Sequence, residues 1–243
     1  MKQNKYDDDV FFEKYAQMDR SQKGLEGAGE WQALQKMLPD FAGRRVLDLG
    51  CGYGWHCRYA LEQGASSVVG VDISEKMLQE ARAKTEAGKV QYLCLPIEDI
   101  DFEPSSFDAV ISSLAFHYLE SFDGICRSVH RCLAAGGDFV FSVEHPVFTA
   151  NAKQDWHYDE QGGRQHWPID RYFNEGLRET EFLGENVMKY HKTLETYVTA
   201  LIQSGFEITG LVEPQPPEKL RDVPGMLDEW RRPMMLLISA RKK

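Results

Sequence analysis

Residues 46–54 read VLDLGCGYG, and this stretch decides the fold. An apolar run contains Asp48 near its end, and glycines follow at three alternate positions, Gly50, Gly52 and Gly54. Because glycine adopts positive φ angles and lets a ligand approach the main chain, such a run is typical of a binding turn. The stretch therefore predicts a buried strand, a tight ligand-binding turn and then a helix.

The spacing of the glycines bears on which ligand the turn holds. The dinucleotide fingerprint GxGxxG uses its third glycine for close packing of strand and helix, and Trp55 stands at that place here. Asp48 precedes the first glycine by two positions, so it would repel a pyrophosphate and attract a positively charged group. The turn thus favours a sulfonium amino acid ligand over a nicotinamide dinucleotide. An NAD(P)-dependent oxidoreductase stays as an alternative.

Short apolar runs alternate with amphipathic stretches from residue 45 onward. This alternation is typical of parallel strands joined by crossover helices. Five strands are predicted at residues 45–50, 67–72, 90–95, 107–115 and 137–145. Helices are predicted between them at residues 55–64, 74–88 and 122–133, and Ser74 is the expected N-cap of the second. A helix at residues 192–205 and strands at residues 206–214 and 233–243 complete the pattern.

The whole chain, residues 1–243, is predicted to form a single domain. Residues 1–44 form an N-terminal segment with one helix within residues 29–40, and residues 45–145 form the cofactor-binding core. Residues 146–190 are rich in Trp, His, Gly, Asp and Tyr without sustained periodicity, so we expect an inserted lid that shapes the substrate site. Residues 191–243 supply the C-terminal helix and strands.

A second acidic residue stands at the end of the second predicted strand. Asp72 lies eighteen residues after Gly54, where a carboxylate can accept hydrogen bonds from both hydroxyls of a ribose. Ile73 and Met77 follow it directly along the chain. Both side chains are expected to pack against an adenine ring, and the alternative for Met77 is a place in the helix core.

Three motifs together resemble a known family. They are LDLGCGYG, VVGVDISEKMLQEAR and SFDAVISSLAFHYL, and a helix and a Gly-Gly turn follow them. This part of the chain resembles the class I S-adenosylmethionine-dependent methyltransferases, and among them the small-molecule enzymes called type 11 or UbiE-like. The resemblance implies an α/β fold: a Rossmann-like, doubly wound seven-stranded sheet, mostly parallel with an antiparallel last strand, in an α/β/α sandwich, to which the lid insertion is added. It also implies S-adenosyl-L-methionine as cofactor and S-adenosyl-L-homocysteine as product.

The resemblance places the cofactor across the carboxyl ends of the strands. Asp48 and the main chain of the glycine turn would hold its methionine part, Asp72 its ribose and Ile73 its adenine. Leu95 and Pro96 stand where such proteins often have a Gly-Asp pair, so the sequence departs from the family there. The expected cofactor-binding residues are Asp48, Gly50, Cys51, Gly52, Gly54, Asp72, Ile73, Met77, Ile97, Glu98, Ser112, Arg20 and Tyr15.

Some of these assignments have a structural alternative. The main chain of Ile97 and the side chain of Glu98 are expected to contact the adenine amino group, and Glu98 facing solvent is the alternative. Tyr15 and Arg20 are expected to fold over the cofactor, with Arg20 paired to its carboxylate. A solvated helix face is the alternative for both.

The acceptor is expected beyond the carboxyl ends of the fourth and fifth strands. A hydroxyl acceptor needs its proton removed, for which a histidine suits near neutral pH, whereas an amine with a free lone pair needs less help. Within FSVEHPVFT, residues 141–149, His145 is the expected base or acceptor-orienting group, and Glu144 beside it is expected to be an orienting group or a cation-binding carboxylate. The expected substrate-binding residues are His117, Tyr190, His191, Trp167 and Tyr172. A capping, packing or structural hydrogen-bonding role is the alternative for each histidine, and an ordinary small hydrophobic cluster is the alternative for the aromatic residues of the insertion.

Composition limits the partners and the compartment. A formal net charge of −10 disfavours nucleic acid and anionic membranes, so a small-molecule acceptor is expected. No apolar run reaches the roughly 20 residues of a membrane span, and the first residues lack a secretory core. Five cysteines without a CxxC pair predict reduced thiols, a cytoplasmic location and no metal site. The expected assembly is a monomer or a homodimer, and a non-catalytic, regulatory S-adenosylmethionine-binding protein stays as an alternative to an enzyme.

Overall fold

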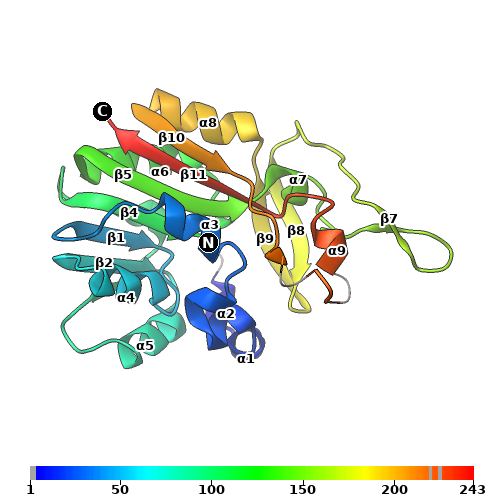
Figure 1. The fold of residues 1–243 in the computed structure, drawn as a ribbon, viewed down its shortest axis with the longest axis horizontal. Coiled ribbons are helices and arrows are strands. Elements are labelled where there is room, and N and C mark those ends of the chain that lie inside the picture. Colours follow the sequence, from blue (N-terminus) through cyan, green and yellow to red (C-terminus); the bar gives the residue numbers. More distant parts are fainter. Residues whose placement is uncertain (1–3, 219–220, 224–225) are drawn as a thin grey trace.

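A seven-stranded sheet forms the centre of the computed structural model, which describes residues 4–218, 221–223 and 226–243 (Figure 1). Its strands are β1 (Arg45–Leu49), β2 (Ser67–Asp72), β3 (Gln91–Cys94), β4 (Phe107–Ser113), β5 (Leu133–Glu144), β10 (Phe206–Val212) and β11 (Met235–Lys242). The order across the sheet is β10-β11-β5-β4-β1-β2-β3. The last strand, β11, is antiparallel to both of its neighbours, and all other pairs are parallel. The predicted sheet is therefore confirmed.

Helices cover both faces of the sheet and bury its apolar side chains. On one face lie α3 (Trp31–Met37), α4 (Trp55–Glu62) and α5 (Glu75–Ala83). On the other face lie α6 (Phe122–Cys132) and α8 (Leu194–Gln203), which pack on the largest core cluster. Phe122 and Tyr197 from these two helices make an edge-on ring contact there, with centroids 4.9 Å apart. The α/β/α sandwich is confirmed.

Side-chain caps set the starts of the crossover helices. The Ser74 hydroxyl accepts a hydrogen bond from the Met77 main-chain N–H at 3.1 Å, as the sequence predicts. The same helix, α5, ends at Ala83, five residues before Gly88, so it is shorter than predicted. Thr85 lies beyond its end and donates its hydroxyl hydrogen to the carbonyl of Ala81, which satisfies one of the last helical carbonyl groups.

The N-terminal segment contains more regular structure than the single helix expected. It holds η1 (Lys5–Asp7), α1 (Asp9–Ala16), α2 (Asp19–Gln22) and η2 (Gly24–Gly27) before α3. Phe11 of α1 is fully buried and meets the ring of Phe182 with centroids 5.9 Å apart. Because Phe11 and Phe182 are far apart in the sequence, the local sequence pattern does not show this contact.

The predicted lid is also more regular than expected. It contains α7 (Pro146–Thr149), a short hairpin of β6 (His157–Tyr158) and β7 (Arg164–His166), and a longer hairpin of β8 (Gly176–Phe182) and β9 (Glu185–His191). Alternate residues of β9, Val187, Lys189 and His191, are buried. Two of these three are polar, so the period of a strand does not appear in the hydrophobicity of the sequence. In Figure 1 the β8–β9 hairpin stands beyond the carboxyl ends of the parallel strands, and the β6–β7 hairpin projects furthest from the body.

Candidate active site

A cavity of about 680 Å³ lies at the carboxyl ends of the parallel strands. Its walls come from the glycine turn after β1, the segments that follow β2, β3 and β4, the end of β5, the N-terminal segment and the β8–β9 hairpin. The structure brings thirteen of the expected site residues to this cavity: Tyr15, Arg20, Gly50, Cys51, Gly52, Asp72, Ile73, Met77, Ile97, Glu98, His117, Glu144 and Tyr190.

The other expected site residues lie outside the cavity lining. They are Asp48, Gly54, Ser112, His145, Trp167, Tyr172 and His191. Asp48, Gly54 and Ser112 belong to the scaffold behind the glycine turn, and the other four lie where the lid joins the core. The contacts of each show what it does there.

The glycine turn leaves no room for side chains. Gly50 has a φ of 77°, and a Cβ added to it would lie 2.4 Å from the Cβ of Ala115. A Cβ on Gly54, whose φ is 71°, would lie 2.2 Å from the hydroxyl oxygen of Tyr92. Gly50 therefore brings the main chain to the cavity wall, whereas Gly54 allows the turn to pack against β3.

Asp72 connects the glycine turn to the start of α5. Its Oδ2 accepts a hydrogen bond from the Gly52 N–H at 2.8 Å, and its Oδ1 accepts one from the Ser74 N–H at 2.9 Å. Burial raises the pKa of this carboxyl, and the two main-chain donors oppose that rise. Each oxygen keeps a lone pair, so a carboxylate at this place on the cavity wall suits the two hydroxyls of a ribose.

An apolar slot lies next to Asp72. Ile73, Met77 and Ile97 line the cavity there, and a Cβ on Gly52 would lie 3.2 Å from the Cε of Met77. A glycine turn, a carboxylate on the cavity wall and apolar side chains beside it are the parts that an adenosine group needs. The residues present therefore fit the nucleoside portion of the expected cofactor.

Asp48 supports the turn from behind instead of facing the cavity. Its carboxyl group is 1% exposed, and Oδ2 accepts a hydrogen bond from the Cys57 thiol at 3.2 Å. Oδ1 has no hydrogen-bond partner among the described residues. Burial raises the pKa of Asp48 to about 7. The resemblance predicts that Asp48 contacts the methionine part of the cofactor, but Asp48 is buried here and does not line the cavity.

Ser112 also has a structural place. Its hydroxyl is buried and donates to the main-chain carbonyl of Leu49 at 2.7 Å. This bond connects the end of β4 to the end of β1, directly before the glycine turn. The neighbouring Ser113 lines the cavity in its stead.

Arg20 faces the cavity in an ion pair that the sequence does not reveal. One of its terminal nitrogens lies 2.7 Å from Oε1 of Glu30, which also accepts a hydrogen bond from the Ser113 hydroxyl at 3.0 Å. Glu30 is 1% exposed. An acidic residue just before a helix looks like an ordinary solvated position, so no signal in the sequence marks it. His56 lines the same region, and burial lowers its pKa to about 4.

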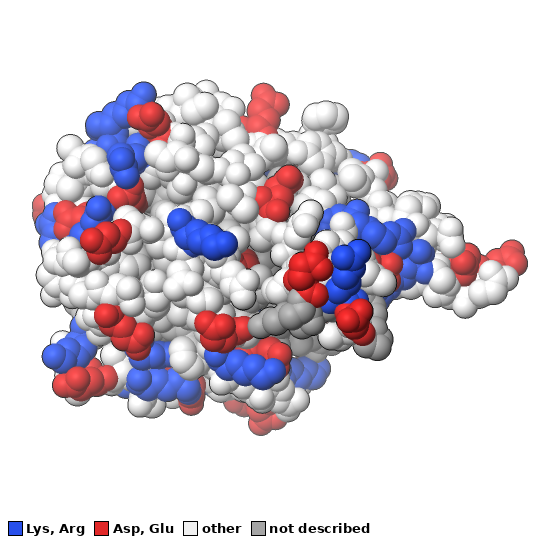
Figure 2. Space-filling view, in the orientation of Figure 1, with Lys and Arg blue, Asp and Glu red and all other residues white. Residues whose placement is uncertain are grey.

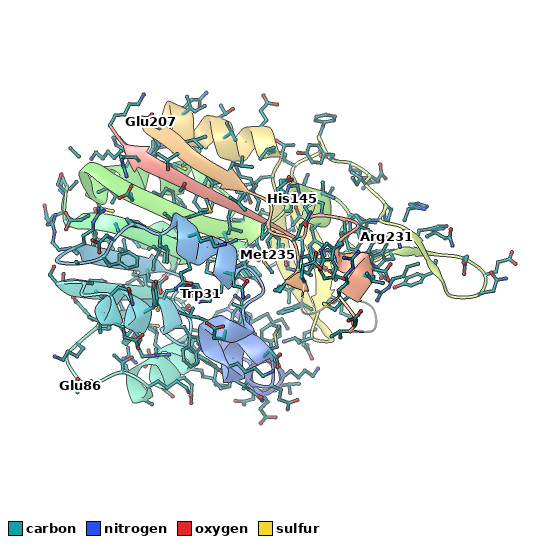
Figure 3. All side chains as sticks on the ribbon, in the orientation of Figure 1. Trp31, Glu86, His145, Glu207, Arg231 and Met235 are labelled. Carbon is teal, nitrogen blue, oxygen red and sulfur yellow. The ribbon has the colours of Figure 1, made fainter. Side chains whose placement is uncertain are left out.

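His145 faces away from the cavity. Its Nδ1 accepts a hydrogen bond from the Val147 N–H at 3.0 Å, which caps α7, and its Nε2 lies 2.7 Å from Oε1 of Glu213. Nδ1 is thus occupied by the helix cap and Nε2 faces a carboxylate on this side of the fold, so the structure does not support the expected role as base. Figure 3 shows His145 and Met235 at the end of the sheet that meets the lid.

Glu144, one residue earlier, lines the cavity and joins three segments. Its Oε1 lies 2.6 Å from Nζ of Lys189, and its Oε2 accepts a hydrogen bond from Nε2 of Gln154 at 2.9 Å. Its main-chain N–H donates to Nδ1 of His117 at 3.4 Å. Burial by itself would raise the pKa of Glu144, but His117 and Lys189 lower it below its usual value. Sequence reasoning missed Lys189 and Gln154, because neither stands in a motif.

Three further expected substrate residues hold the base of the lid. Nδ1 of His191 lies 2.8 Å from the Thr149 hydroxyl, and Nε2 lies 2.8 Å from the Tyr172 carbonyl oxygen. The Tyr172 hydroxyl accepts a hydrogen bond from the Leu194 N–H at 3.1 Å. Trp167 donates its indole N–H to a main-chain carbonyl at 3.1 Å. These contacts are structural, so they agree with the alternative that His191, Tyr172 and Trp167 pack the lid.

Comparisons with known proteins agree with this geometry. The family model for the methyltransferase domain matches residues 47–141. A crystal structure from Listeria monocytogenes, assigned to the S-adenosylmethionine-dependent methyltransferases, is 56% identical, with a TM-score of 0.83 over 88% of this chain and 98% of that one. The S-adenosylmethionine-dependent methyltransferase from Mesorhizobium loti is 47% identical, with a TM-score of 0.84 over 90% of this chain and 100% of that one.

A relative with a named acceptor matches a shorter stretch. The tRNA U34 carboxymethyltransferase of Methylococcus capsulatus is 37% identical over 118 residues, which cover 47% of this chain and 36% of that protein. The two crystal structures, in contrast, match nearly end to end at high identity. The glycine turn, the position of Asp72 and these neighbours lead to one assignment, which leaves no place for the oxidoreductase alternative. The chain belongs to the S-adenosylmethionine-dependent methyltransferases, is an enzyme of that class, and uses S-adenosyl-L-methionine as its methyl donor.

Proposed function

We propose that this enzyme transfers a methyl group to an oxygen or nitrogen atom of a small-molecule acceptor. The observation that carries the proposal is one cavity that extends from the glycine turn and Asp72 to Glu144 and the β8–β9 hairpin. Its volume, about 680 Å³, is within the range of roughly 300–1,000 Å³ that small-ligand sites occupy. Donor and acceptor would therefore meet inside one cavity.

In the half of the cavity next to β1 and β2, the chain holds the cofactor. Asp72 binds the ribose, and Ile73, Met77 and Ile97 pack against the adenine. Gly50 and Gly52 present main chain to the methionine part, and Cys51 lies between them. Arg20 pairs with its carboxylate, Tyr15 packs beside it, and Glu98 with the Ile97 main chain contacts the adenine amino group. Bound S-adenosylmethionine supplies an electrophilic methyl group on a positively charged sulfur.

In the half below the lid, the chain positions the acceptor and keeps water out. The β8–β9 hairpin of the lid contacts the N-terminal segment in two places. The rings of Phe11 and Phe182 meet, and Lys14 forms an ion pair with Glu185, 3.6 Å apart. Two segments far apart in the sequence thus close over the same space. Because an in-line displacement depends on positioning and on exclusion of water, this closure is what the chain contributes to rate.

The surface supports a small acceptor. Figure 2 shows acidic and basic side chains mixed over this face instead of one continuous basic surface. The net charge of −10 also opposes binding to a phosphate backbone. The tRNA-modifying relative makes nucleic acid the second candidate acceptor, and the experiment below separates the two.

Location and assembly are proposals of the same kind. All five cysteines are free, which fits a reducing compartment such as the cytoplasm. No helix in the described part of the chain has the length and apolar character to cross a bilayer. We expect a monomer or a homodimer in solution, which light scattering at several concentrations would determine.

The first experiment measures the cofactor site directly. Replacing Asp72 with Asn removes a charged hydrogen-bond acceptor, so the Kd for S-adenosylmethionine should rise about 10- to 100-fold in calorimetry. Asp108→Asn is the matched control, because Asp108 pairs with Arg45 at 2.8 Å and lies outside the cavity lining. Equal affinities for the two variants would contradict the proposed role of Asp72.

The second experiment identifies the class of acceptor. The enzyme is incubated with S-adenosylmethionine carrying a tritiated methyl group and with three fractions of a bacterial extract: RNA, protein and molecules of low mass. We expect label in the low-mass fraction. Label that appears only in RNA would replace this proposal with the second candidate.

A further inference from the structure

Two buried side chains meet Glu144 at the acceptor end of the cavity. His117 is 2% exposed and comes from η4 (Phe116–Tyr118), which packs against β9 and the end of β5. Lys189 is also 2% exposed and comes from β9. Both line the cavity together with Glu144. The question is which hydrogen-bonding groups they offer to an acceptor.

The tautomer of His117 follows from its main-chain partner. A main-chain N–H can only donate, so Nδ1 of His117 must accept the bond from Glu144 and carries no proton. The proton of the neutral ring is therefore on Nε2, which has no hydrogen-bond partner among the described residues. Burial lowers the pKa of His117 to about 4, so the ring is neutral near pH 7. His117 is thus a hydrogen-bond donor at the cavity and not a base.

Lys189 is a second donor. An ammonium group has three N–H bonds, and two of them are directed to Oε1 of Glu144 and, at 3.0 Å, to Oε1 of Gln154. The third has no oxygen partner among the described residues, and the Phe182 ring lies 5.4 Å from Nζ. Each carboxylate oxygen of Glu144 already accepts one hydrogen bond, from Lys189 or from Gln154. Around Glu144 the cavity therefore presents N–H donors beside a carboxylate that is already paired, and the other glutamates that line this part of the cavity, Glu120 and Glu181, are exposed.

Such a site selects among acceptors by charge and by hydrogen bonding. An aliphatic amine is protonated near pH 7, lacks a lone pair in that form, and would lie beside the Lys189 ammonium. A phenol or alcohol would need a base to take its proton. A carboxylate is already an anion, accepts strong hydrogen bonds from N–H donors, and needs no base.

We infer that the acceptor is a carboxylic acid, whose carboxylate is held by the Nε2–H of His117 and an N–H of Lys189 while one of its oxygens is methylated. This inference rests on the proposed function and narrows it to oxygen. A lone pair of the carboxylate oxygen forms the new O–CH₃ bond as the CH₃–S bond breaks and its electron pair goes to sulfur. The products are a methyl ester and S-adenosylhomocysteine, and no proton is transferred.

Base lability of the product tests the inference for an acceptor of any structure. The tritium-labelled low-mass products are treated with dilute alkali, which hydrolyses methyl esters to volatile methanol and leaves methyl ethers and methylamines intact. We expect most of the label to become volatile. Label that stays in the solution would overturn the carboxylic acid while leaving the proposed function standing. If no low-mass product is labelled, the proposed function fails, and this inference fails with it.

Two variants at one position separate a donor from a base. His117→Gln keeps an N–H near the place of Nε2, whereas His117→Leu removes it. For the leucine variant, kcat/KM for the acceptor should fall about 10- to 100-fold with little change in the Kd for the cofactor, and glutamine should recover most of the loss. Equal and severe losses in both variants would show a base, and an active leucine variant would show no role at all.

A control variant separates acceptor binding from folding. Lys192→Met alters another buried lysine, whose Nζ donates to the main-chain carbonyl of Leu119 and, at 3.4 Å, to that of Tyr190, and which itself lies outside the cavity lining. We expect this variant to lower stability and to leave kcat/KM of the folded enzyme within a factor of about two. A loss as large as that of His117→Leu would show that packing of the lid, and not the donor, explains both results.

Discussion

Lys189 of the lid hairpin and Glu144 at the end of β5 form a buried ion pair, with Nζ 2.6 Å from Oε1. The two residues are 45 positions apart in the chain. Gln154, between them in sequence, bonds to both side chains, and Thr180 of β8 donates its hydroxyl hydrogen to Oε1 of Gln154 at 3.0 Å. A single network of polar groups thus connects the lid to the core at the wall of the cavity.

Removing one partner of this pair should be more damaging than removing both. In Lys189→Met the Glu144 carboxylate stays buried without its cation, so the free energy of unfolding should fall by about 3–5 kcal/mol. Adding Glu144→Gln should restore a large part of that loss. Urea unfolding of the two variants measures the difference.

An exposed pair serves as the control for that comparison. Lys84→Met breaks the ion pair with Glu80 on the surface of α5, where both partners are more than a third exposed. It should change the free energy of unfolding by no more than about 0.5 kcal/mol. If Lys189→Met lowers the free energy of unfolding no more than Lys84→Met does, the buried pair does not stabilise the packing of the lid on the core.

The glycine turn offers a second prediction with a matched control. Gly50→Ala adds a Cβ that would lie 2.4 Å from the Ala115 Cβ, at a φ of 77°. Gly136→Ala adds one at nearly the same φ, 74°, with no atom within 4 Å. In the control, the free energy of unfolding should fall only by the cost of placing alanine in a left-handed backbone conformation, about 1–2 kcal/mol. Gly50→Ala should lose more and should also weaken binding of S-adenosylmethionine, which calorimetry measures. Equal effects in both variants would mean that the turn is not tightly packed.

Asp48 gives a prediction about pH. Its folded pKa, about 7, is above the usual value of 3.8, so the folded state holds this proton more tightly than the unfolded chain does. Tighter proton binding by Asp48 stabilises the folded state. This stabilisation is complete below about pH 4 and is lost as the pH rises to 7. Between pH 5 and pH 8 the wild type should therefore lose roughly 2–3 kcal/mol relative to Asp48→Asn. Urea unfolding of both proteins at the two pH values tests this, and a difference that does not vary with pH would contradict it.

His145 should prove dispensable for turnover. His145→Gln removes the side chain that caps α7 and faces Glu213, outside the cavity. We expect the free energy of unfolding to fall by about 1 kcal/mol and kcat to stay within a factor of about two. Turnover with the low-mass extract, measured beside thermal unfolding, separates the two effects. A large loss of kcat in a stably folded variant would return the base role to His145.

Local patterns in the sequence determined the fold and the positions of the residues that are proposed to hold the nucleoside. The glycine spacing in VLDLGCGYG and the apolar run before it are properties of a few neighbouring residues, so they predict β1, the turn and α4 wherever the chain goes. The same holds for Asp72, because the end of a parallel strand brings its side chain to the ligand edge of the sheet. The start of α5 is equally local, since the Ser74 cap needs only its own helix.

Such local patterns do not predict contacts between distant segments. Glu30 and Lys189 belong to the site region because α3 and β9 pack there, and nothing near either residue in the sequence shows it. Their burial depends on charged partners at distant positions, Arg20 and Glu144. A charged residue in isolation is expected at the surface, so the sequence concealed both.

The contrast is sharpest at Glu144 and His145. The sequence determined that two ionisable residues stand side by side where β5 ends, and it favoured His145 as the catalytic group because a histidine suits proton transfer near neutral pH. Only the tertiary structure decided that Glu144 lines the cavity and that His145 turns to α7 and Glu213. The physical reason is the pleat of an extended chain, in which successive side chains point to opposite sides, so neighbours in the sequence enter different surroundings.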